Sequence, residues 1–335
     1  MNDTIATGHM MRCLAIADAA KSIGQSTVFI LADNEAVGLL KERGYEYIVL
    51  DTDWNNMESE IGILEQLILK WKINRILIDS YQVTKSYLQK LQKLTEVYYI
   101  DDLDEYVYPV KGLICYEINW DSRNYEERYN GTELMVGLQY TPLRTTFSNI
   151  KQKQINEKVK NMLLLSGGTD TKDFLNTIIN NIDRSQYDRI DVICGRYYEK
   201  CDYLRKKYAQ YSNVFIWHAV NNIEKFMINA DVAISAGGTT LYELCACGTP
   251  TISYALADNQ LNSVENFQKK GIIDYAGDIR TDNVIDRIRE LLNSYSLPQK
   301  RKMKSEQMQK IIDGKGAFRI IEKLVTNTKC VKEGQ

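Results

Sequence analysis

Short apolar runs rich in isoleucine, leucine and valine alternate with helical segments along the 335 residues, and this alternation constrains the fold more than any other feature. In the first half, "STVFILA" (26–32) and "INRILIDSY" (73–81) have the composition of buried strands, whereas "ESEIGILEQLILKWK" (58–72) has the apolar spacing of an amphipathic helix. Strands that are apolar on both faces and separated by helices form parallel sheets covered on both sides. The sequence therefore predicts an α/β protein with doubly wound, Rossmann-like sheets.

The second half repeats the alternation, with glycine turns at the ends of its strands. "VKNMLLLSGGTD" (159–170) predicts a strand that runs into such a turn, and residues 188–195 and 213–218 predict further strands. Residues 230–255 predict a strand, a glycine turn, a helix, a glycine stop and another strand in succession. The tail at 280–327 has helical character throughout.

Two domains of ordinary size are expected, because 335 residues are long for one hydrophobic core. The polar segment 140–158 is the predicted linker, which gives an N-terminal Rossmann-like domain over 1–148 and a C-terminal, UDP-binding domain with terminal helices over 149–335. The two doubly wound domains are expected to face each other across a cleft. Only "MNDTIA" precedes the glycine turn at Gly8, so the strand that normally opens such a domain is expected to be absent.

Composition and charge narrow the class of partners. A net charge of −2 and 26% charged residues give no electrostatic reason to expect nucleic acid or an anionic membrane. No apolar run approaches the ~20 residues that span a bilayer, and no signal peptide is visible, so a cytoplasmic location is expected. The seven cysteines are scattered, and Cys245 and Cys247 fit free buried thiols better than a zinc site.

Three glycine-containing segments stand where ligands bind in parallel sheets, which is at the loops that follow strands and enter helices. Glycine lets the backbone approach a phosphate closely, and the N–H groups and dipole of a helix start attract the anion. A tight turn alone also accounts for each glycine, but two similar turns in one domain favour phosphate binding. The segments are Gly8-His9, Ser166-Gly167-Gly168-Thr169 and Ala236-Gly237-Gly238-Thr239-Thr240.

Two further residues beside these turns each allow two interpretations. Thr240 and Glu243 form a T-x-x-E pattern, which is typical of a capping box, or Glu243 accepts hydrogen bonds from both ribose hydroxyls of a nucleotide. His9 stands at a helix start, where the dipole disfavours the imidazolium, so a neutral ring is available as a general base. A polar cap that contacts the backbone is the alternative for His9.

Polar side chains at the ends of predicted strands add candidates. Asp79, Asp101 and Asp102 are alternative bases, and Tyr81 could bind a sugar at the cleft. Adjacent residues on a strand point to opposite faces, so Asp101 and Asp102 do not form a metal pair, and no third ligand supports a metal site. No metal is therefore expected.

Asp258 and Asn259 open a predicted helix after "TISYALA". Asn259 is a candidate for binding substrate hydroxyls. Asp258 is a further candidate base or part of the binding segment, and a plain N-cap is the competing interpretation.

Several motifs together resemble one family. They are "TGHMMRCLAIA", "LIDSY", "YIDD", "LLLSGGTD", "AISAGGTTLYELCACGTPTI", "DNQ" and "IDGKGAFRI", spread over nearly the whole chain. The resemblance is to the UDP-sugar hydrolases of pseudaminic acid biosynthesis, which act on UDP-2,4-diacetamido-2,4,6-trideoxy-β-L-altropyranose. The C-terminal glycine-rich segment is shared more broadly with transferases of the glycosyltransferase-B type, including the one that adds GlcNAc to lipid I.

This resemblance implies an enzyme without metal or cofactor that hydrolyses the bond between the anomeric carbon and UDP and inverts that centre. His9 aligns with the family's catalytic histidine in the motif Gly-His-x-x-Arg-Cys, and Tyr81 and Asn259 fall where the family keeps active-site residues. Glu243 and the 236–240 turn match its UDP-binding segment. The chain departs from the family at its start, where members usually have a strand ahead of the Gly-His turn.

Three other functions stay open at this level. They are a glycosyltransferase that passes the sugar to a hydroxyl acceptor, a UDP-sugar 2-epimerase with hydrolytic side chemistry, and a nucleotide-sugar-binding protein without turnover. All of them share a small-molecule UDP-sugar as the expected partner. The exact sugar and the oligomeric state do not follow from the sequence.

Overall fold

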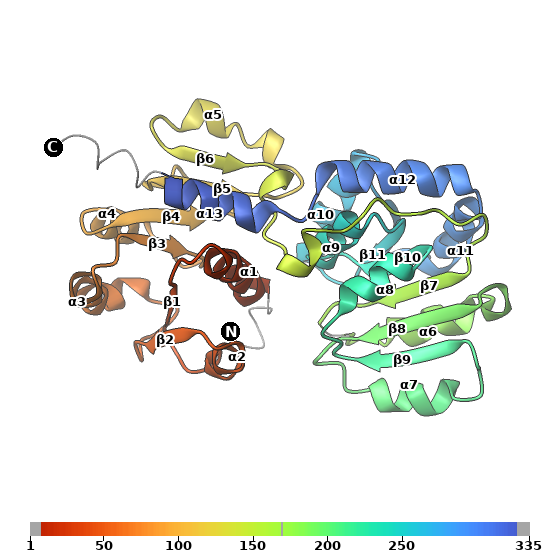
Figure 1. The fold of residues 1–335 in the computed structure, drawn as a ribbon. Helices are drawn as coiled ribbons and strands as arrows, with labels where there is room; N and C mark the ends of the chain where they lie inside the picture. Colours follow the sequence, from red (N-terminus) through yellow and green to blue (C-terminus); the bar gives the residue numbers. More distant parts are fainter. Residues whose placement is uncertain (1–7, 169, 327–335) are drawn as a thin grey trace. The chain divides into compact units, whose positions relative to one another are not determined.

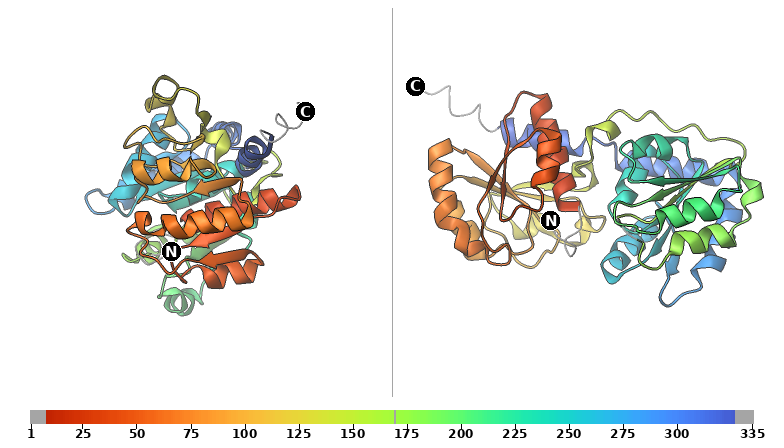
Figure 2. Two further views of the ribbon diagram at one scale, coloured as in Figure 1. Left: turned by 90° about the vertical axis from the view of Figure 1, so that its left-hand side faces the viewer. Right: turned by 90° about the horizontal axis from the view of Figure 1, so that it is seen from below.

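The computed structural model describes residues 8–168 and 170–326, which form two compact units (Figure 1, Figure 2). The first unit comprises Met1–Thr145 together with Lys315–Gln335, and the second comprises Thr146–Gly314. The boundary at residue 145 falls inside the polar segment that the sequence predicts as a linker. Every strand pair in both units is parallel, which confirms the α/β class expected from the alternation of strands and helices.

The strands of the first unit form two parallel sheets. One sheet pairs β1 with β2, and the other has the order β3-β4-β5-β6. Among the described residues, no strand lies between β1 and β3 to join the two sheets. The sequence predicts that an opening strand is absent before Gly8, but this prediction concerns residues 1–7, which the structure does not describe. The strands are β1 (Val28–Leu31), β2 (Glu46–Val49), β3 (Arg75–Ile78), β4 (Glu96–Ile100), β5 (Gly112–Cys115) and β6 (Glu133–Val136).

Helices α3 and α4 bury the main core of the first unit against the β3–β6 sheet. Leu64 and Ile68 of α3 and Leu88 and Leu91 of α4 pack with alternate residues of β3, β4 and β5. The helices of this unit are α1 (Gly8–Ser22), α2 (Val37–Arg43), α3 (Ile61–Trp71), α4 (Lys85–Leu91), α5 (Tyr125–Arg128) and α13 (Gly316–Thr326), with short 3₁₀ segments η1 (Met57–Glu60), η2 (Trp120–Ser122), η3 (Leu138–Tyr140) and, at the boundary, η4 (Thr145–Phe147).

The last helix belongs to the first unit, which differs from the expected domain of residues 149–335. Figure 1 shows α13, in blue, beside α1. Its apolar stripe buries Ala317, Ile320 and Leu324. Gly316 lies so close to the backbone of Thr141 that a Cβ atom there would overlap the Thr141 carbonyl oxygen. The sequence shows that this helix is amphipathic, but not which unit covers its apolar stripe.

The second unit is a doubly wound domain with a six-stranded parallel sheet in the order β12-β11-β10-β7-β8-β9. The strand order therefore reverses between β7 and β10, and ligands of such sheets bind at the carboxyl ends of the strands beside this reversal. The strands are β7 (Asn161–Leu165), β8 (Arg189–Cys194), β9 (Val214–His218), β10 (Val232–Ala236), β11 (Thr251–Ala255) and β12 (Asp274–Asp278).

Helices cover both faces of this sheet, as the right-hand view of Figure 2 shows. One buried cluster combines α6, α7 and α11 with alternate strand residues such as Ile190, Val192 and Ile234. The helical tail expected at 280–327 is divided into α11, α12 and α13. The helices of the second unit are α6 (Phe174–Asn181), α7 (Cys201–Tyr208), α8 (Ile223–Asn229), α9 (Thr240–Cys247), α10 (Asp258–Lys269), α11 (Val284–Tyr295) and α12 (Pro298–Ile311), with η5 (Arg184–Gln186). In the part of the chain that the structure describes, no helix combines the length and the apolar character needed to cross a membrane.

Candidate active site

A histidine and an aspartate are in contact at the carboxyl end of the first unit's β3. His9 is the second residue of α1, and Asp79 follows directly after β3. The Nδ1 atom of His9 lies 2.6 Å from Oδ1 of Asp79, and the side chains are 20% and 4% exposed. Nη2 of Arg12 also lies 3.2 Å from this nitrogen. The shorter contact is with the carboxylate, and two acceptors would repel at 2.6 Å, so we infer that Nδ1 carries the proton and donates a hydrogen bond to Asp79. The other ring nitrogen, Nε2, then holds the lone pair that a general base needs.

Arg12 ties this pair to a second aspartate. One helical turn after His9, its guanidinium donates from Nε to Oδ2 of Asp79 over 2.6 Å and from Nη2 to the other oxygen of that carboxylate. It also donates to both oxygens of Asp102, over 3.0 and 2.8 Å, and to the hydroxyl of Tyr116 over 2.7 Å. Burial opposes the charge on Arg12, but Tyr116 and the two carboxylates outweigh burial and raise the pKa of the guanidinium. The arginine is therefore a permanent cation within the cluster.

This arginine decides the protonation state of Asp79. Burial alone would raise the pKa of the carboxyl, yet the charge of Arg12 and the hydrogen bonds from Arg12 and His9 lower that pKa to about 2. Asp79 is therefore ionised at neutral pH and is a poor proton acceptor. Of the two roles open to it, base or partner of a base, the geometry favours the partner that orients the imidazole.

The adjacent aspartates after β4 point in opposite directions, as the alternation along a strand predicts. Asp102 faces the arginine, whereas the buried Asp101 accepts hydrogen bonds from the Tyr125 hydroxyl over 2.7 Å and from the N–H groups of Leu103 and Asp104. Burial raises the pKa of Asp101. Within residues 8–168 and 170–326, no three or more His, Cys, Asp or Glu side chains are grouped to hold a metal ion.

Tyr81 joins the same cluster from the loop after β3. Its hydroxyl donates to Oδ2 of Asp102 over 3.2 Å, and its ring meets the His9 ring edge-on with centroids 4.6 Å apart. Burial, and next the charge of Asp102, raise the pKa of Tyr81, so its hydroxyl keeps its proton. The side chain is still 43% exposed and can reach a ligand. Gly8, as the first residue of α1, begins the helix that presents His9.

In the second unit, two glycine turns follow neighbouring strands. The turn at Ser166–Gly168 follows β7, and the turn that begins at Ala236 ends β10; these strands pair with Leu165 opposite Ser235. Both turns therefore stand at the reversal of the strand order. A Cβ atom on Gly237 would overlap Cγ1 of Val264, so a close approach requires this glycine. The structure thus brings these two predicted phosphate-binding turns together; Thr169, which the sequence places in the first of them, lies outside the described residues.

Helix α9 begins one residue earlier than a capping box of Thr240 and Glu243 requires. Thr239 is the N-cap residue and makes no side-chain cap bond, and Thr240 is the first helical residue. Because Thr240 is not the N-cap, the capping-box interpretation of Thr240 and Glu243 is wrong. Glu243 lies half-buried in the first turn of α9, one helical turn beyond the glycine turn.

Asp258 and Asn259 begin α10, which follows the next strand along the sheet, β11. Asp258 forms an ion pair with Arg280 over 2.7 Å, and hydrogen bonding to Arg280 lowers the pKa of this exposed carboxyl. Ala257 is the N-cap residue, so the interpretation of Asp258 as a plain N-cap is wrong. Asn259 is exposed. Both residues belong to the second unit, whereas His9 and Tyr81 belong to the first.

Sequence reasoning missed the role of Arg12. The residue stands in the quoted motif "TGHMMRCLAIA", but its partners Asp79 and Asp102 are 67 and 90 residues away along the chain. The only local signal was the i, i+3 spacing from His9, which places both side chains on one face of a helix.

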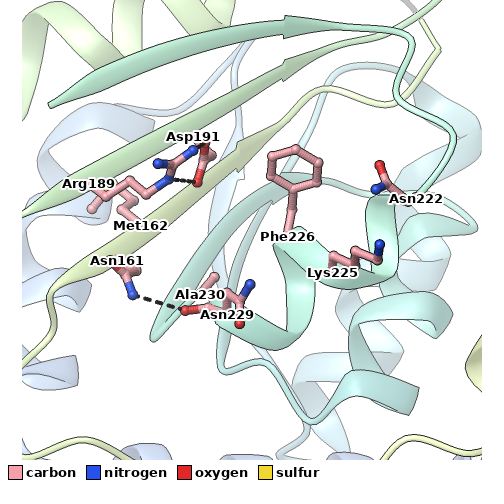
Figure 3. A pocket seen from close by; sticks show the side chains of 9 residues that line it. All are labelled: Asn161, Met162, Arg189, Asp191, Asn222, Lys225, Phe226, Asn229 and Ala230. Carbon is pink, nitrogen blue, oxygen red and sulfur yellow. Dashed lines mark hydrogen bonds and ion pairs between the residues drawn. The ribbon is translucent and has the colours of Figure 1, made fainter. Parts of the chain in front are cut away.

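A pocket lies at the opposite edge of the second unit's sheet. Figure 3 shows a pocket of about 400 Å³ between α8 and the sheet of the second unit. Asn161 and Arg189 stand at the amino ends of β7 and β8, so this pocket reaches the end of the strands opposite the glycine turns. Arg189 pairs with Asp191 over 2.6 Å, and Asn161 donates to the Asn229 carbonyl oxygen over 3.2 Å. The lining residues are Asn161, Met162, Arg189, Asp191, Asn222, Lys225, Phe226, Asn229 and Ala230.

Comparisons with known proteins give one family match confined to the second unit and several matches over nearly the whole chain. Residues 146–310 match the family "Glycosyl transferases group 1". An uncharacterized protein of Methanocaldococcus jannaschii is 21% identical over 98% of this chain, which spans 65% of that protein's length. The spore coat polysaccharide biosynthesis protein SpsG of Bacillus subtilis is 22% identical over 93% of this chain and 92% of its own.

A third relative shares only part of the chain. The UDP-N-acetylglucosamine--N-acetylmuramyl-(pentapeptide) pyrophosphoryl-undecaprenol N-acetylglucosamine transferase of Campylobacter jejuni is 35% identical over 130 residues, which is 36% of each protein.

Solved structures share the fold over the whole chain. MurG of Acinetobacter baumannii has a TM-score of 0.69 at 13% identity and covers 95% of this chain and 96% of its own. A UDP-N-acetylglucosamine 2-epimerase has a TM-score of 0.64 at 13% identity, with 96% and 95% covered. The chain therefore has the glycosyltransferase-B fold, and its second unit carries the similarity to the group 1 glycosyl transferases.

Proposed function

We propose that this protein is an enzyme that hydrolyses a UDP-linked sugar at the anomeric C–O bond and releases UDP and the free sugar. The observation that carries the proposal is the contact of 2.6 Å between His9 Nδ1 and Asp79 Oδ1. This contact supports an imidazole with Nδ1 as donor and Nε2 as acceptor. The ion pair with the buried Arg12 keeps Asp79 ionised at neutral pH, so its carboxylate remains an acceptor for Nδ1.

In the proposed step, Nε2 of His9 takes a proton from a water molecule as its oxygen bonds to the anomeric carbon. The bond from that carbon to the diphosphate oxygen breaks, and its electron pair leaves with UDP. Attack on the face opposite the leaving group inverts the centre. Tyr81 and Asn259 are proposed to hold the sugar so that the attacking oxygen, the carbon and the leaving oxygen are in line.

The second unit is proposed to bind the nucleotide. Backbone N–H groups at the Ser166–Gly168 and Ala236–Thr240 turns would face the diphosphate at the reversal of the strand order, where such sheets bind ligands. Glu243 would accept hydrogen bonds from the two ribose hydroxyls. Donors that are fixed before the reaction stabilise the negative charge that develops on the leaving diphosphate. The proposed reaction uses no metal ion.

The proposed substrate is a UDP-linked 2,4-diacetamido-2,4,6-trideoxy hexose of pseudaminic acid biosynthesis. Support comes from the motifs around His9, Tyr81 and Asn259 and from similarity to a polysaccharide biosynthesis protein over 93% of the chain. A cytoplasmic location is proposed with it, because nucleotide sugars are made and used there.

The test measures UDP release from this substrate without any acceptor, with NMR of the sugar product to establish inversion. His9→Gln is expected to lower the rate by on the order of 10²–10⁴, whereas EDTA leaves the wild-type rate unchanged. The matched control is His218→Gln, which removes the other histidine of the chain, at the end of β9. A His9→Gln rate within a few-fold of wild type, or inactivation by EDTA, would contradict the mechanism.

A glycosyltransferase is the second candidate, because residues 146–310 match a glycosyl transferase family. Such an enzyme would release UDP only when a hydroxyl acceptor is present. A 2-epimerase would change the configuration at C2, which NMR of the product reveals, and a binding protein would release no UDP at all. UDP release without an acceptor, with C2 retained, excludes all three.

A further inference from the structure

The loop after β8 packs tightly against the first glycine turn of the second unit. A Cβ atom on Gly195 would overlap the carbonyl oxygens of Gly167 and Gly168, so the two backbones are in direct contact. The N–H of Tyr197 donates to the Gly168 carbonyl oxygen over 3.1 Å. Because β7 and β8 are paired neighbours, the loop at 195–198 extends the row of turns at the carboxyl edge of the sheet.

Local hydrogen bonds hold the two loops in place and engage the nearby carboxylates of Asp170 and Asp173. The buried Asp170 accepts from the N–H groups of Phe174 and Leu175, both over 2.9 Å, at the start of α6. Asp173 accepts from the Tyr198 hydroxyl and faces Lys200 over 3.7 Å. Both acidic side chains are therefore occupied with the framework of the two loops.

Two donors at this place have no partner among the described residues. The hydroxyl of Ser166, whose residue is 3% exposed, is buried without a hydrogen bond. Arg196 is exposed, directly after Gly195, and forms no ion pair with a described residue. A buried hydroxyl without a partner costs free energy unless a ligand satisfies it. A hydroxyl and a guanidinium together select an anionic oxygen acceptor.

The order of the loops along the sheet edge indicates which part of a nucleotide they meet. Helix α9, which carries Glu243, follows β10; the Ser166 turn follows β7, its neighbour; and Arg196 follows β8, beyond β7. If Glu243 holds the ribose with the base on the β11 side, the chain of phosphates leads from α9 across the β7 turn toward β8. The group that reaches Arg196 is the phosphate farther from the ribose.

We infer that Arg196, supported by the Ser166 hydroxyl, binds the distal phosphate of a UDP-sugar and makes the protein select nucleoside diphosphates over monophosphates. This inference rests on the proposed function, because it names a binding residue for that substrate. The guanidinium would also neutralise charge on the departing UDP, as positively charged side chains do in other diphosphate sites. Arg196 is then a specificity-determining residue that local sequence patterns do not reveal.

The test compares the binding of UDP, UMP and uridine to the full chain by calorimetry. Arg196→Gln should weaken UDP binding about ten- to a hundredfold, the loss of a charge-assisted hydrogen bond to phosphate, while UMP and uridine change by less than about threefold. Ser166→Ala should show a smaller loss with the same selectivity, and Arg196→Lys should retain part of the affinity. Lys206→Gln on α7 makes the same change of charge at an exposed position and should have no effect.

The outcomes separate this inference from the proposed function. If wild type binds UDP no more tightly than uridine, the proposed function fails. If wild type prefers UDP and Arg196→Gln keeps the same ratio of UDP to UMP affinity, the inference fails and the proposed function stands. An equal loss for all three ligands would also overturn the inference, because it would show a structural role for Arg196.

Discussion

At the scale of single residues, the chemistry of the first unit depends on one arginine that itself does not react. Arg12 lowers the pKa of Asp79 and donates hydrogen bonds to Asp102, and His9 is the group of this cluster proposed to accept a proton. Removing one partner of a buried ion pair costs about 3–5 kcal/mol because the other charge is left buried alone, so loss of Arg12 would destabilise the first unit.

Asp79→Asn tests the orientation of the imidazole. An amide keeps the size of the side chain but lacks the charge that holds the Nδ1 proton, so His9 can adopt the other tautomer. We expect kcat for UDP release to fall on the order of tenfold or more, with KM changed less than about threefold. Steady-state kinetics measures kcat and KM separately, on a variant whose circular dichroism spectrum matches that of the wild type. A rise in KM alone would assign Asp79 to substrate binding.

The pKa of Asp79 predicts a loss of stability in acid. The carboxyl titrates near pH 4 when unfolded and at about 2 when folded, so its ionised form contributes roughly 2–3 kcal/mol to the free energy of unfolding. This contribution is fully present above pH ~4 and disappears as the pH falls through about 2. Urea unfolding at pH 6 and pH 3 should show a smaller loss for Asp79→Asn than for wild type. Equal losses in the two proteins would contradict the lowered pKa.

At the scale of elements, two adjacent glycines of the 236–240 turn differ in the space around them. A Cβ atom on Gly237 would overlap Val264, whereas Gly238 has no atom within 4 Å of that position. Gly237→Ala should therefore lower the free energy of unfolding by about 1–3 kcal/mol, and Gly238→Ala should change it little. Denaturant titration of the two variants checks this. Equal effects would mean that the turn relaxes around the added methyl group.

The sequence predicts a strand only where the strand's own residues form an apolar run. The apolar runs located β7, β8, β10 and β11, because such strands carry their signal in their own residues. Strand β12, "DYAGD", has no apolar run and was missed, because its place is set by pairing with β11. The sequence likewise indicated His9 and Tyr81, which the structure brings together. It did not indicate the ion pairs of Arg12 with Asp79 and Asp102, because these partners are 67 and 90 positions away along the chain.

At the scale of the whole molecule, the chain leaves the first unit at residue 145 and re-enters it at residue 315. The fully buried Ile320 of α13 belongs to the first unit, and Ile288 of α11, 1% exposed, belongs to the second. Ile320→Ala should destabilise the first unit by about 2–5 kcal/mol and leave the unfolding of the second unchanged, with Ile288→Ala giving the reverse. Hydrogen exchange followed by peptide analysis assigns each change to its unit. A loss of protection in the second unit alone on Ile320→Ala would place α13 there.

The return of α13 to the first unit sets the order of events during synthesis. The second unit is one continuous stretch and can fold as soon as it leaves the ribosome, whereas the first must wait for α13, which is synthesised after the whole second unit. A newly made chain would thus complete its second unit before its first, the reverse of the usual order from the N-terminus onward. Until α13 is synthesised, the face of α1 that it contacts stays uncovered.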